Sequence, residues 1–309
     1  MKTEAARVAF TRTLLALAKE DPSLFAVATD SSGSVTLTDF AAQLPNQFVE
    51  CGIAEQDAIG ISAGLSNGGL RPFVCGPACF YTLRSAEQIK IDVAYSHMNV
   101  KVIGVSGGVS YGALGSTHHA VQDIALLRAV PGLELYLPSD GPQMAALTRY
   151  LAQSDTPAYV RVGRGAVPVI YEDDVPFTPG KANRLRQGSA AALIACGEMV
   201  YPSLKAAELL AGEGVEVSVY DMHTLRPLDE AAVLEAARTG CVLTVEEHSI
   251  HGGLGGAVAE LLCQKRPTLM RILGLPDEKL YNGSSAEVFE HYGLTAQSIA
   301  EAVRQLKRQ

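Results

Sequence analysis

Hydrophobic positions in the first half of the chain follow two alternating patterns. Short apolar runs, such as residues 24–30 (LFAVATD) and 100–106 (VKVIGVS), predict buried strands. Between such runs, apolar residues recur at helical spacing, as in residues 3–19 and 55–68. Strands that alternate with helices run largely parallel in one sheet. The pattern therefore predicts an α/β domain, with a mostly parallel sheet flanked by helices.

The same reading places the remaining elements of this half. Strands are expected at residues 47–51, 71–76, 133–138 and 158–163, and helices at residues 79–98, 120–130 and 140–153. The pattern fails between about residues 163 and 188, where proline, glycine and charged residues are typical of a connector.

A second alternating series follows the connector and predicts a smaller α/β domain. Its strands are expected at residues 189–197, 215–222, 241–248 and 268–275, and its helices at residues 201–210, 228–240, 251–262 and 295–307. We therefore predict a first domain over residues 1–165, a linker over residues 166–187 and a second domain over residues 188–309.

Composition narrows the class of protein. A hydrophobic fraction of 48% supports a sizeable core, and a net charge of −8 without a basic stripe argues against a nucleic-acid binder. The six cysteines form no Cys-x-x-Cys pair, which favours reduced thiols. The first residues do not resemble a signal peptide, and no apolar run reaches membrane-spanning length. We expect a cytoplasmic location.

Candidate chemistry lies after the predicted strands, because the carboxyl ends of parallel strands share one edge of a sheet. The side chains at these positions are Asp30, Glu55, Phe80, Tyr81, His118, Asp140 and Arg164. Simpler roles exist for several of them: a Glu in the first turn of a helix suits the helix dipole, an Asp before a helix is a common N-cap, and aromatic residues are often core.

A glycine-rich stretch, residues 251–258 (HGGLGGAV), is a weaker candidate. It could form a phosphate loop, but it lacks the Lys-Ser/Thr pair of a P-loop.

Several motifs, taken in order, resemble the transketolase family. They are residues 52–74 (GIAEQDAIGISAGLSNGGLRPFV), 84–95 (RSAEQIKIDVAY) and 115–140, followed by residues 220–229 (YDMHTLRPLD) and 244–262 (TVEEHSIHGGLGGAVAELL). The match covers the pyrimidine-binding and C-terminal domains of that family. A full-length transketolase has a preceding domain with a GDG…N signature, and no GDG occurs here.

The resemblance therefore implies the C-terminal subunit of a split transketolase. A separate N-terminal subunit would bind the diphosphate of thiamine diphosphate and carry the Mg²⁺ ligands, so we place no metal ligands on this chain. An α₂β₂ assembly is expected. The reaction would transfer a two-carbon ketol unit from a ketose to an aldehyde acceptor.

The family resemblance also implies a role for Glu55, in the GIAEQ motif. That glutamate bonds to N1′ of the cofactor's aminopyrimidine and promotes the imino tautomer, which removes the proton from the thiazolium C2. We expect Ile53, Ala54, Ala58 and Ile59 to hold the carboxyl group in a low-dielectric site, where it can share a proton with the ring.

The remaining site residues are assigned by the same resemblance. Either Phe80 or Tyr81 would stack on the pyrimidine, and both alternatives stay open. Asp30 matches an acidic residue of the cofactor site. His118 matches the histidine that stabilises oxygen charge on the sugar.

Three further residues match groups that hold the sugar phosphate in transketolases. These are Arg7, Ser34 and Arg164, and arginine suits bidentate recognition of phosphate. We expect them to bind the anionic end of the substrate.

Four positions depart from the family pattern. Ser106 replaces a histidine, Leu114 replaces an acid that contacts sugar hydroxyls, His119 replaces a glutamine, and Ser31 replaces a larger apolar residue. We therefore expect an anionic sugar with an altered hydroxyl pattern, or with a deoxy position, rather than xylulose 5-phosphate.

Two alternatives stay open at this point. One is the β subunit of a 2-oxoacid dehydrogenase E1 component, which has the same two domains and a similar glutamate. His118 in GSTHHAVQD favours the ketol-transferring branch. The other is a non-catalytic partner subunit, which the presence of both Glu55 and His118 disfavours.

Overall fold

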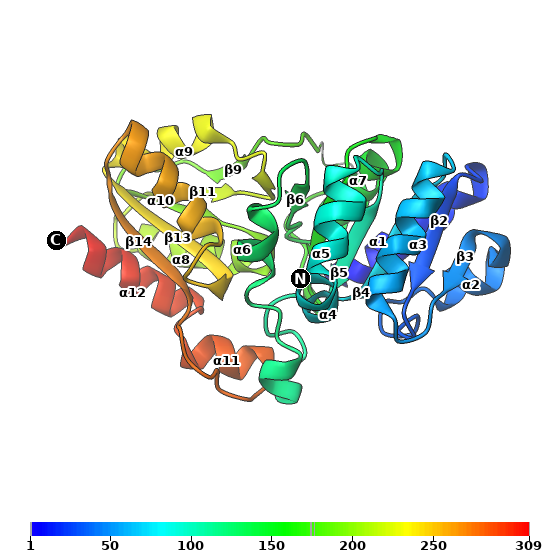
Figure 1. Ribbon diagram of the computed structural model, residues 1–309. Helices are drawn as coiled ribbons and strands as arrows, with labels where there is room; N and C mark the ends of the chain where they lie inside the picture. Colours follow the sequence, from blue (N-terminus) through cyan, green and yellow to red (C-terminus); the bar gives the residue numbers. More distant parts are fainter. Residues whose placement is uncertain (1, 174, 176, 309) are drawn as a thin grey trace.

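The protein folds around two sheets, each with its own helices. The computed structural model describes residues 2–173, 175 and 177–308. The two units lie side by side in Figure 1, the first drawn in blue to green and the second mainly in yellow to red. Both sheets are mostly parallel and flanked by helices, which confirms the predicted fold class.

The first sheet has seven strands in the order β12-β6-β7-β5-β4-β2-β3. Its strands are β2 (Leu24–Ala28), β3 (Phe48–Glu50), β4 (Arg71–Pro77), β5 (Lys101–Val105), β6 (Glu134–Tyr136), β7 (Ala158–Val162) and β12 (Thr224–Arg226). Only β12 runs antiparallel to its neighbour, and it comes from the second half of the chain. The halves are thus joined by a shared sheet edge.

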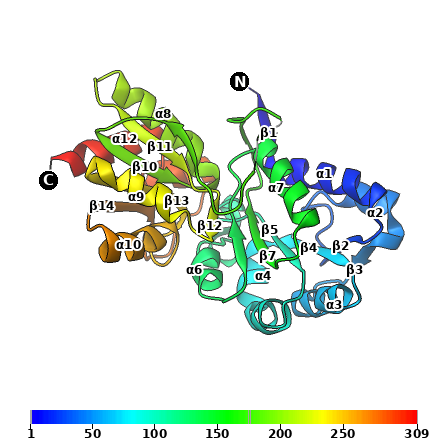
Figure 2. The ribbon, with the colours of Figure 1, turned by 90° about the horizontal axis from the view of Figure 1, so that it is seen from above.

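Helices cover both faces of this sheet, as Figure 2 shows. One face packs against α1 (Ala6–Glu20) and α7 (Gly141–Gln153), which also contact each other. The other face packs against α3 (Glu55–Asn67), α4 (Ala78–Arg84) and α6 (Asp123–Arg128). The strands are buried on both faces, as expected for a parallel sheet covered by helices.

The second sheet has five strands in the order β14-β13-β10-β11-β9. They are β9 (Asn183–Arg186), β10 (Ala191–Ala195), β11 (Val217–Asp221), β13 (Cys241–Ser249) and β14 (Leu269–Leu275), and only β9 is antiparallel. The helices are α8 (Val200–Ala211) and α12 (Ala296–Lys307) on one face, with α9 (Glu230–Ala236) and α10 (Leu254–Lys265) on the other.

One predicted helix is interrupted in the structure. The expected helix over residues 79–98 ends as α4 at Arg84, and the chain restarts after Ser85 as the short α5 (Ala86–Gln88) and a π-helix, η2 (Ile89–Tyr95). The break places Arg84 at a helix end, from which its side chain reaches the neighbouring helix α3.

Several short elements were not predicted. They are β1 (Thr3–Ala5), which pairs with β8 (Ala166–Pro168), the strands β9 and β12, and α2 (Thr38–Gln43), η1 (Pro45–Gln47), η3 (Gly112–Thr117), η4 (Gly197–Met199) and α11 (Ser285–His291). The short η5 (Ala237–Thr239) continues α9 within the helix predicted over residues 228–240. The connector over residues 166–187 thus contains β8 and β9. The domain limits themselves remain our prediction. No helix in the described part of the chain is long and apolar enough to cross a membrane.

Candidate active site

The candidate residues follow the carboxyl ends of parallel strands in the first sheet. Glu55 begins the helix after β3, Phe80 lies in the helix after β4, and Arg164 follows β7. In open α/β sheets this edge forms the ligand-binding crevice.

Glu55 lies in the first turn of α3, and only 3% of its surface is exposed. Its Oε2 accepts a hydrogen bond of 2.5 Å from Nη1 of Arg84, which neutralises the buried carboxylate. The other oxygen, Oε1, accepts no hydrogen bond from the described residues. One oxygen is therefore held by the protein, while the second is available to a ligand.

The surroundings of Glu55 differ from the expectation in one respect. Ala58 and Ile59 are fully buried beneath it, but 76% of Ile53 is exposed. The expectation that Ile53 helps to keep the carboxyl group in a low-dielectric site is wrong for this chain, since the Ile53 side chain is exposed beside Gly52, which has a φ of +68°. The nearest polar neighbour of the carboxylate is Arg84.

The two candidate aromatic residues, Phe80 and Tyr81, lie in different environments. Tyr81 is fully buried, and its ring lies where a side chain on Gly76 would be, so it belongs to the core. Phe80 is half-buried and carries the guanidinium of Arg84 at 4.8 Å from its ring centroid. Phe80 is therefore the aromatic residue with an accessible ring in the crevice.

His118 joins the two ends of the site. Its ring lies edge-on to Phe80 at 5.4 Å and to Tyr111 at 5.2 Å between centroids. Its Nδ1 also lies 2.9 Å from the hydroxyl of Thr117. Because three side chains fix the imidazole, His118 can present Nε2 to a ligand in one orientation.

The far end of the site holds two arginines. The guanidinium of Arg164 lies 5.1 Å from the ring centroid of Tyr111. Nε of Arg7 donates to the carbonyl oxygen of Arg164 at 2.9 Å, and Nη1 of Arg7 donates to the carbonyl oxygen of Ser34. The structure thus brings together the three residues predicted to bind phosphate, with Ser34 contributing its main chain to Arg7.

These arginines lack anionic partners. Among the described residues, neither guanidinium forms an ion pair with a carboxylate, and Nη1 of Arg164 is buried without a hydrogen-bond acceptor. Burial, followed by the neighbouring charge of Arg164, lowers the pKa of Arg7 from its ordinary value. An arriving anion would satisfy this end of the site.

Asp30 stands apart from this series of contacts. Its side chain is exposed, and its backbone N–H donates to Oε1 of Glu50 at 2.6 Å. Asp30 and Ser106 both have left-handed backbone conformations, with φ of +51° and +61°. Such conformations are costly for residues other than glycine and cluster at functional sites.

The four departures from the family pattern also have places in the structure. Leu114 is 56% exposed on the loop before His118, whereas Ser106 and His119 are buried. The hydroxyl groups of Ser31 and Ser106 have no hydrogen-bond partner within the described chain. The crevice therefore contains buried polar groups that a ligand or a water molecule could satisfy.

Sequence reasoning missed two site residues, Arg84 and Tyr111. Arg84 lies four positions after Phe80, a spacing that places both on one face of a helix and could have identified it. Tyr111 lies in an irregular loop without periodicity, so its position between His118 and Arg164 had no signal in the sequence.

The glycine-rich stretch does not form a phosphate loop here. Oε2 and Oε1 of Glu246 accept the backbone N–H groups of Leu254 and Gly255, each at 2.7 Å. The helix N-terminus of α10 is therefore capped by the protein's own carboxylate, which lies where a side chain on Gly253 would be. Its glycine allows this close approach.

The fold and the family models place this chain in the transketolase family. The chain matches the family model for the transketolase pyrimidine-binding domain over residues 2–169 and that for the transketolase C-terminal domain over residues 180–299. The chain belongs to this family, which implies thiamine diphosphate as the cofactor.

Its relatives identify the type of subunit. The chain is 54% identical to an apulose-4-phosphate transketolase subunit from Phocaeicola vulgatus, over 96% of both chains. It is 36% identical to the 6-deoxy-6-sulfo-D-fructose transketolase subunit SqwH from a Clostridium species, over 95% of this chain and 91% of that protein. A solved split-gene transketolase, an inactive β₄ tetramer, superposes with a TM-score of 0.90 at 35% identity over 99% of both chains.

These relatives confirm the main prediction, a C-terminal subunit of a split transketolase. The chain is accordingly a transferase subunit. They favour this function over the 2-oxoacid dehydrogenase β subunit and over a non-catalytic partner.

Proposed function

We propose that this chain provides the pyrimidine end and the substrate end of a ketol-transfer site. The main support is a continuous series of contacts along the sheet edge, made between side chains except at the last step, where Arg7 donates to the main chain of Arg164. It runs through Glu55, Arg84, Phe80, His118, Tyr111, Arg164 and Arg7. A carboxylate stands at one end, and at the other stand two cations that form no ion pair with the described residues.

The residues present fit the pyrimidine end of thiamine diphosphate. Phe80 offers a half-exposed ring for stacking, and Oε1 of Glu55 is available to accept a hydrogen bond from a ring nitrogen. When bound, this cofactor supplies the carbanion chemistry of ketol transfer. Glu55 would hold and exchange the proton at N1′, and Arg84 would keep its carboxylate oriented. We assign Asp30 to the edge of the cofactor site.

His118 would act on the sugar. Its imidazole is fixed by Phe80 and Tyr111, so a ring nitrogen can donate to the substrate oxygen on which negative charge develops. Leu114 offers no hydrogen bond to a sugar hydroxyl. Recognition near the reacting carbons would therefore rest mainly on His118.

We propose apulose 4-phosphate, or a closely similar sugar phosphate, as the substrate. The name of the Phocaeicola vulgatus relative supports this choice at 54% identity. The unpaired Arg7 and Arg164 independently call for an anionic group, and the buried Nη1 of Arg164 lacks an acceptor. A phosphate at this end would receive charge-assisted hydrogen bonds.

The partner would be an N-terminal transketolase subunit that contributes the diphosphate and Mg²⁺ ligands. We propose an α₂β₂ assembly in the cytoplasm, a compartment in keeping with six free cysteines. The solved split-gene relative is described as an inactive β₄ tetramer, which supports the need for a second kind of subunit.

Reconstitution tests this proposal. The purified chain alone, with saturating thiamine diphosphate and Mg²⁺, should show no ketol transfer, and activity should appear on adding the N-terminal subunit. A panel of donors should favour apulose 4-phosphate over xylulose 5-phosphate and 6-deoxy-6-sulfofructose. Robust turnover by the single chain would contradict the split site, and a preference for xylulose 5-phosphate would contradict the assigned substrate.

A further inference from the structure

The loop that carries His118 and Tyr111 is held at its base by the second domain. We call residues 107–120 the substrate loop. Its ends pair with each other, because the N–H of Gly108 donates to the carbonyl oxygen of Ala120 at 3.0 Å and the reverse bond measures 2.8 Å. The base is therefore a two-residue bridge, and whatever holds this bridge fixes the loop above it.

Glu247 of β13 contacts this base, as does Ser285 of α11, whose hydroxyl donates to the carbonyl oxygen of Val109 at 3.3 Å. Oε1 of Glu247 accepts the backbone N–H of Val109 at 2.7 Å in a buried position. The carboxyl group lies where a side chain on Gly108 would be, and Gly108 has a φ of +61°. Any other residue at position 108 would meet both a steric and a conformational barrier.

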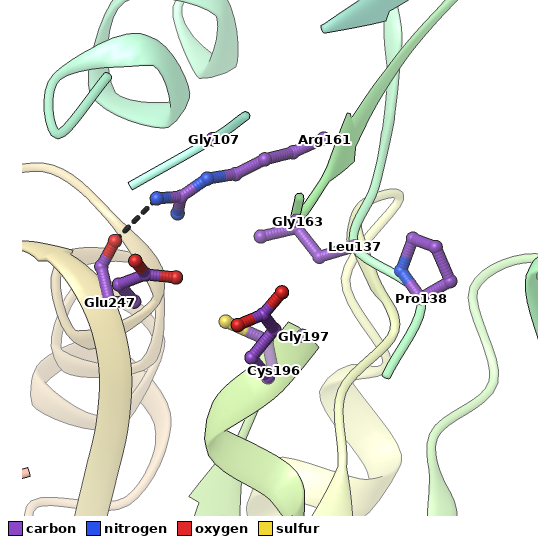
Figure 3. Close-up of a pocket in the computed structure, with 9 residues that line it drawn as sticks. Gly107, Leu137, Pro138, Arg161, Gly163, Cys196, Gly197 and Glu247 are labelled. Atoms are coloured by element: carbon purple, nitrogen blue, oxygen red, sulfur yellow. Dashed lines mark hydrogen bonds between the residues drawn. The ribbon is translucent and has the colours of Figure 1, made fainter. Parts of the chain in front are cut away.

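Arg161 ties the other end of the base to the same residue. Its Nη2 donates to the carbonyl oxygens of Ala120, at 3.3 Å, and of Glu247. Figure 3 shows this guanidinium reaching from β7 toward Glu247 across the space between the domains. Both ends of the substrate loop thus converge on one glutamate of the second domain.

A small cavity of about 20 Å³ lies beside this contact, large enough for about one water molecule. It is lined from the first domain by Gly107, Leu137, Pro138, Arg161 and Gly163, and from the second by Cys196, Gly197, Glu198 and Glu247 (Figure 3). Glu198 occupies the place that a side chain on Gly163 would take, next to Arg164. The second domain therefore approaches the site closely at Gly108 and Gly163, in addition to the places where Asn282 and Gly283 approach Gly115 and Gly112 of the substrate loop.

We propose that Glu247 is a positioning residue for ketol transfer, through which the second domain holds the substrate loop and so places His118 and Tyr111. This inference rests on the proposed function for its catalytic consequence. The contact itself is independent of that function. It gives the second domain a part in substrate binding, although none of its residues belongs to the contact series from Glu55 to Arg7.

The titration of Glu247 provides a way to detect this role by experiment. Burial, and then the charge of Glu198, raises the pKa of Glu247 from its usual 4.5 to about 8. The other charged groups that face it are Arg161 and Asp123, while Glu246 and His248 are its neighbours on β13. Burial therefore favours the protonated form of the carboxyl group.

The direction of the pH effect follows from this shift. Because folding raises this pKa, the stabilising contribution of Glu247 is complete below about pH 4.5 and is lost as the pH rises through about 8. Ionisation then places a second negative charge beside Glu198. We expect the substrate loop to loosen above that pH, with an increase in KM for the sugar phosphate.

Three variants test the proposal. Glu247→Ala removes the acceptor for Val109, Glu247→Gln keeps an acceptor but cannot ionise, and Glu246→Gln is the matched control on the neighbouring residue, which caps α10. Two properties should be measured: amide hydrogen exchange of residues 108–120 in the purified full-length chain, and KM against pH in the reconstituted complex, with the phosphorylated ketose as donor.

We expect Glu247→Ala to speed exchange across the substrate loop and to raise KM about 10-fold, the scale of one lost buried hydrogen bond. Glu247→Gln should restore most of the protection and abolish the alkaline rise in KM. Glu246→Gln should lower stability while leaving loop exchange and the pH profile of KM as in the wild type. Because hydrogen exchange needs no turnover, a complex inactive on every sugar would count against the proposed function alone.

Two results would overturn the positioning role. One is unchanged loop exchange in Glu247→Ala. The other is an equal rise in KM in Glu246→Gln and Glu247→Ala, since that would make the effect a general consequence of weakening the second domain.

Discussion

The two ends of the candidate site differ in whether their charged side chains are paired. At the α3 end, the carboxylate of Glu55 is buried and paired with Arg84 at 2.5 Å. At the α1 end, the guanidinium groups of Arg7 and Arg164 meet only carbonyl oxygens and an aromatic ring among the described residues. At the first end the protein itself supplies the counter-ion, and at the second end the described residues supply none.

This difference indicates what each end can bind. A balanced carboxylate with one available oxygen can exchange a proton with a neutral ring without attracting free cations. Unpaired arginines are unfavourable to bury alone, so their retention at one edge favours a ligand that brings negative charge. Phe80, His118 and Tyr111 separate the two ends with aromatic rings, which keeps the acid of one end away from the cations of the other.

The largest expected effect comes from the balanced end. Glu55→Gln keeps the shape of the side chain and its hydrogen-bonding capacity, but removes its acid-base function. In the reconstituted complex, hydrogen–deuterium exchange at C2 of the cofactor should slow by roughly 10²- to 10⁴-fold, the usual contribution of general acid-base catalysis.

Asp57→Asn provides the control for this change. Asp57 lies in the same first turn of α3 and is exposed, so its neutralisation alters the helix N-terminus equally without touching the crevice. An unchanged exchange rate in Glu55→Gln, or an equal loss in Asp57→Asn, would show that Glu55 only stabilises the helix.

A smaller effect is expected at the unpaired end. Arg164→Ala should raise KM for a sugar phosphate about 10- to 100-fold, because one or two charge-assisted hydrogen bonds would be lost. The uncharged acceptor glycolaldehyde should be affected much less, since the lost contact is remote from the reacting atoms. Steady-state kinetics of the reconstituted complex measure both.

Arg184→Ala is the matched control, because Arg184 forms an exposed ion pair with Glu235 in the second domain. It should leave both KM values unchanged. Equal losses on the charged and uncharged substrates in Arg164→Ala would identify Arg164 as structural rather than phosphate-binding.

The sequence predicted the sheets better than the local irregularities. Runs such as β5 and β10 are apolar at nearly every position because both faces of a parallel strand are buried. The break at Ser85 and the π-helix that follows it carry no such signal, since apolar residues continue through them. The strand β12 was also missed, because its three residues pair with a strand almost ninety positions earlier in the chain.

The site was predictable where residues follow strands and unpredictable where loops fold back. Glu55, Phe80 and Arg164 are brought to one edge by topology alone. Phe80 and Tyr81 are consecutive and point about 100° apart around α4, and only the structure, with Tyr81 buried against Gly76, shows which ring enters the core. The contact of Glu247 with Val109 joins residues 138 positions apart, so no local pattern could indicate it.

The smallest expected effect concerns the middle of the site, where Tyr111 lies between His118 and Arg164. Its ring supports His118 edge-on at 5.2 Å and Arg164 through a cation–π contact at 5.1 Å. Each such contact contributes about 0.5–1 kcal/mol at a partly exposed site, so loss of both in Tyr111→Ala should raise KM for the sugar phosphate roughly 5- to 30-fold. Tyr111→Phe keeps the ring and should stay within about 2-fold of the wild type, on the same scale of energies.

The two variants should be compared with both a phosphorylated ketose and an uncharged ketose as donor. If the ring positions His118 as well as Arg164, Tyr111→Ala should weaken use of both donors, with the larger loss on the phosphorylated one. A loss of the same size in Tyr111→Phe would instead assign the effect to the hydroxyl group and would remove the aromatic bridge between the two ends.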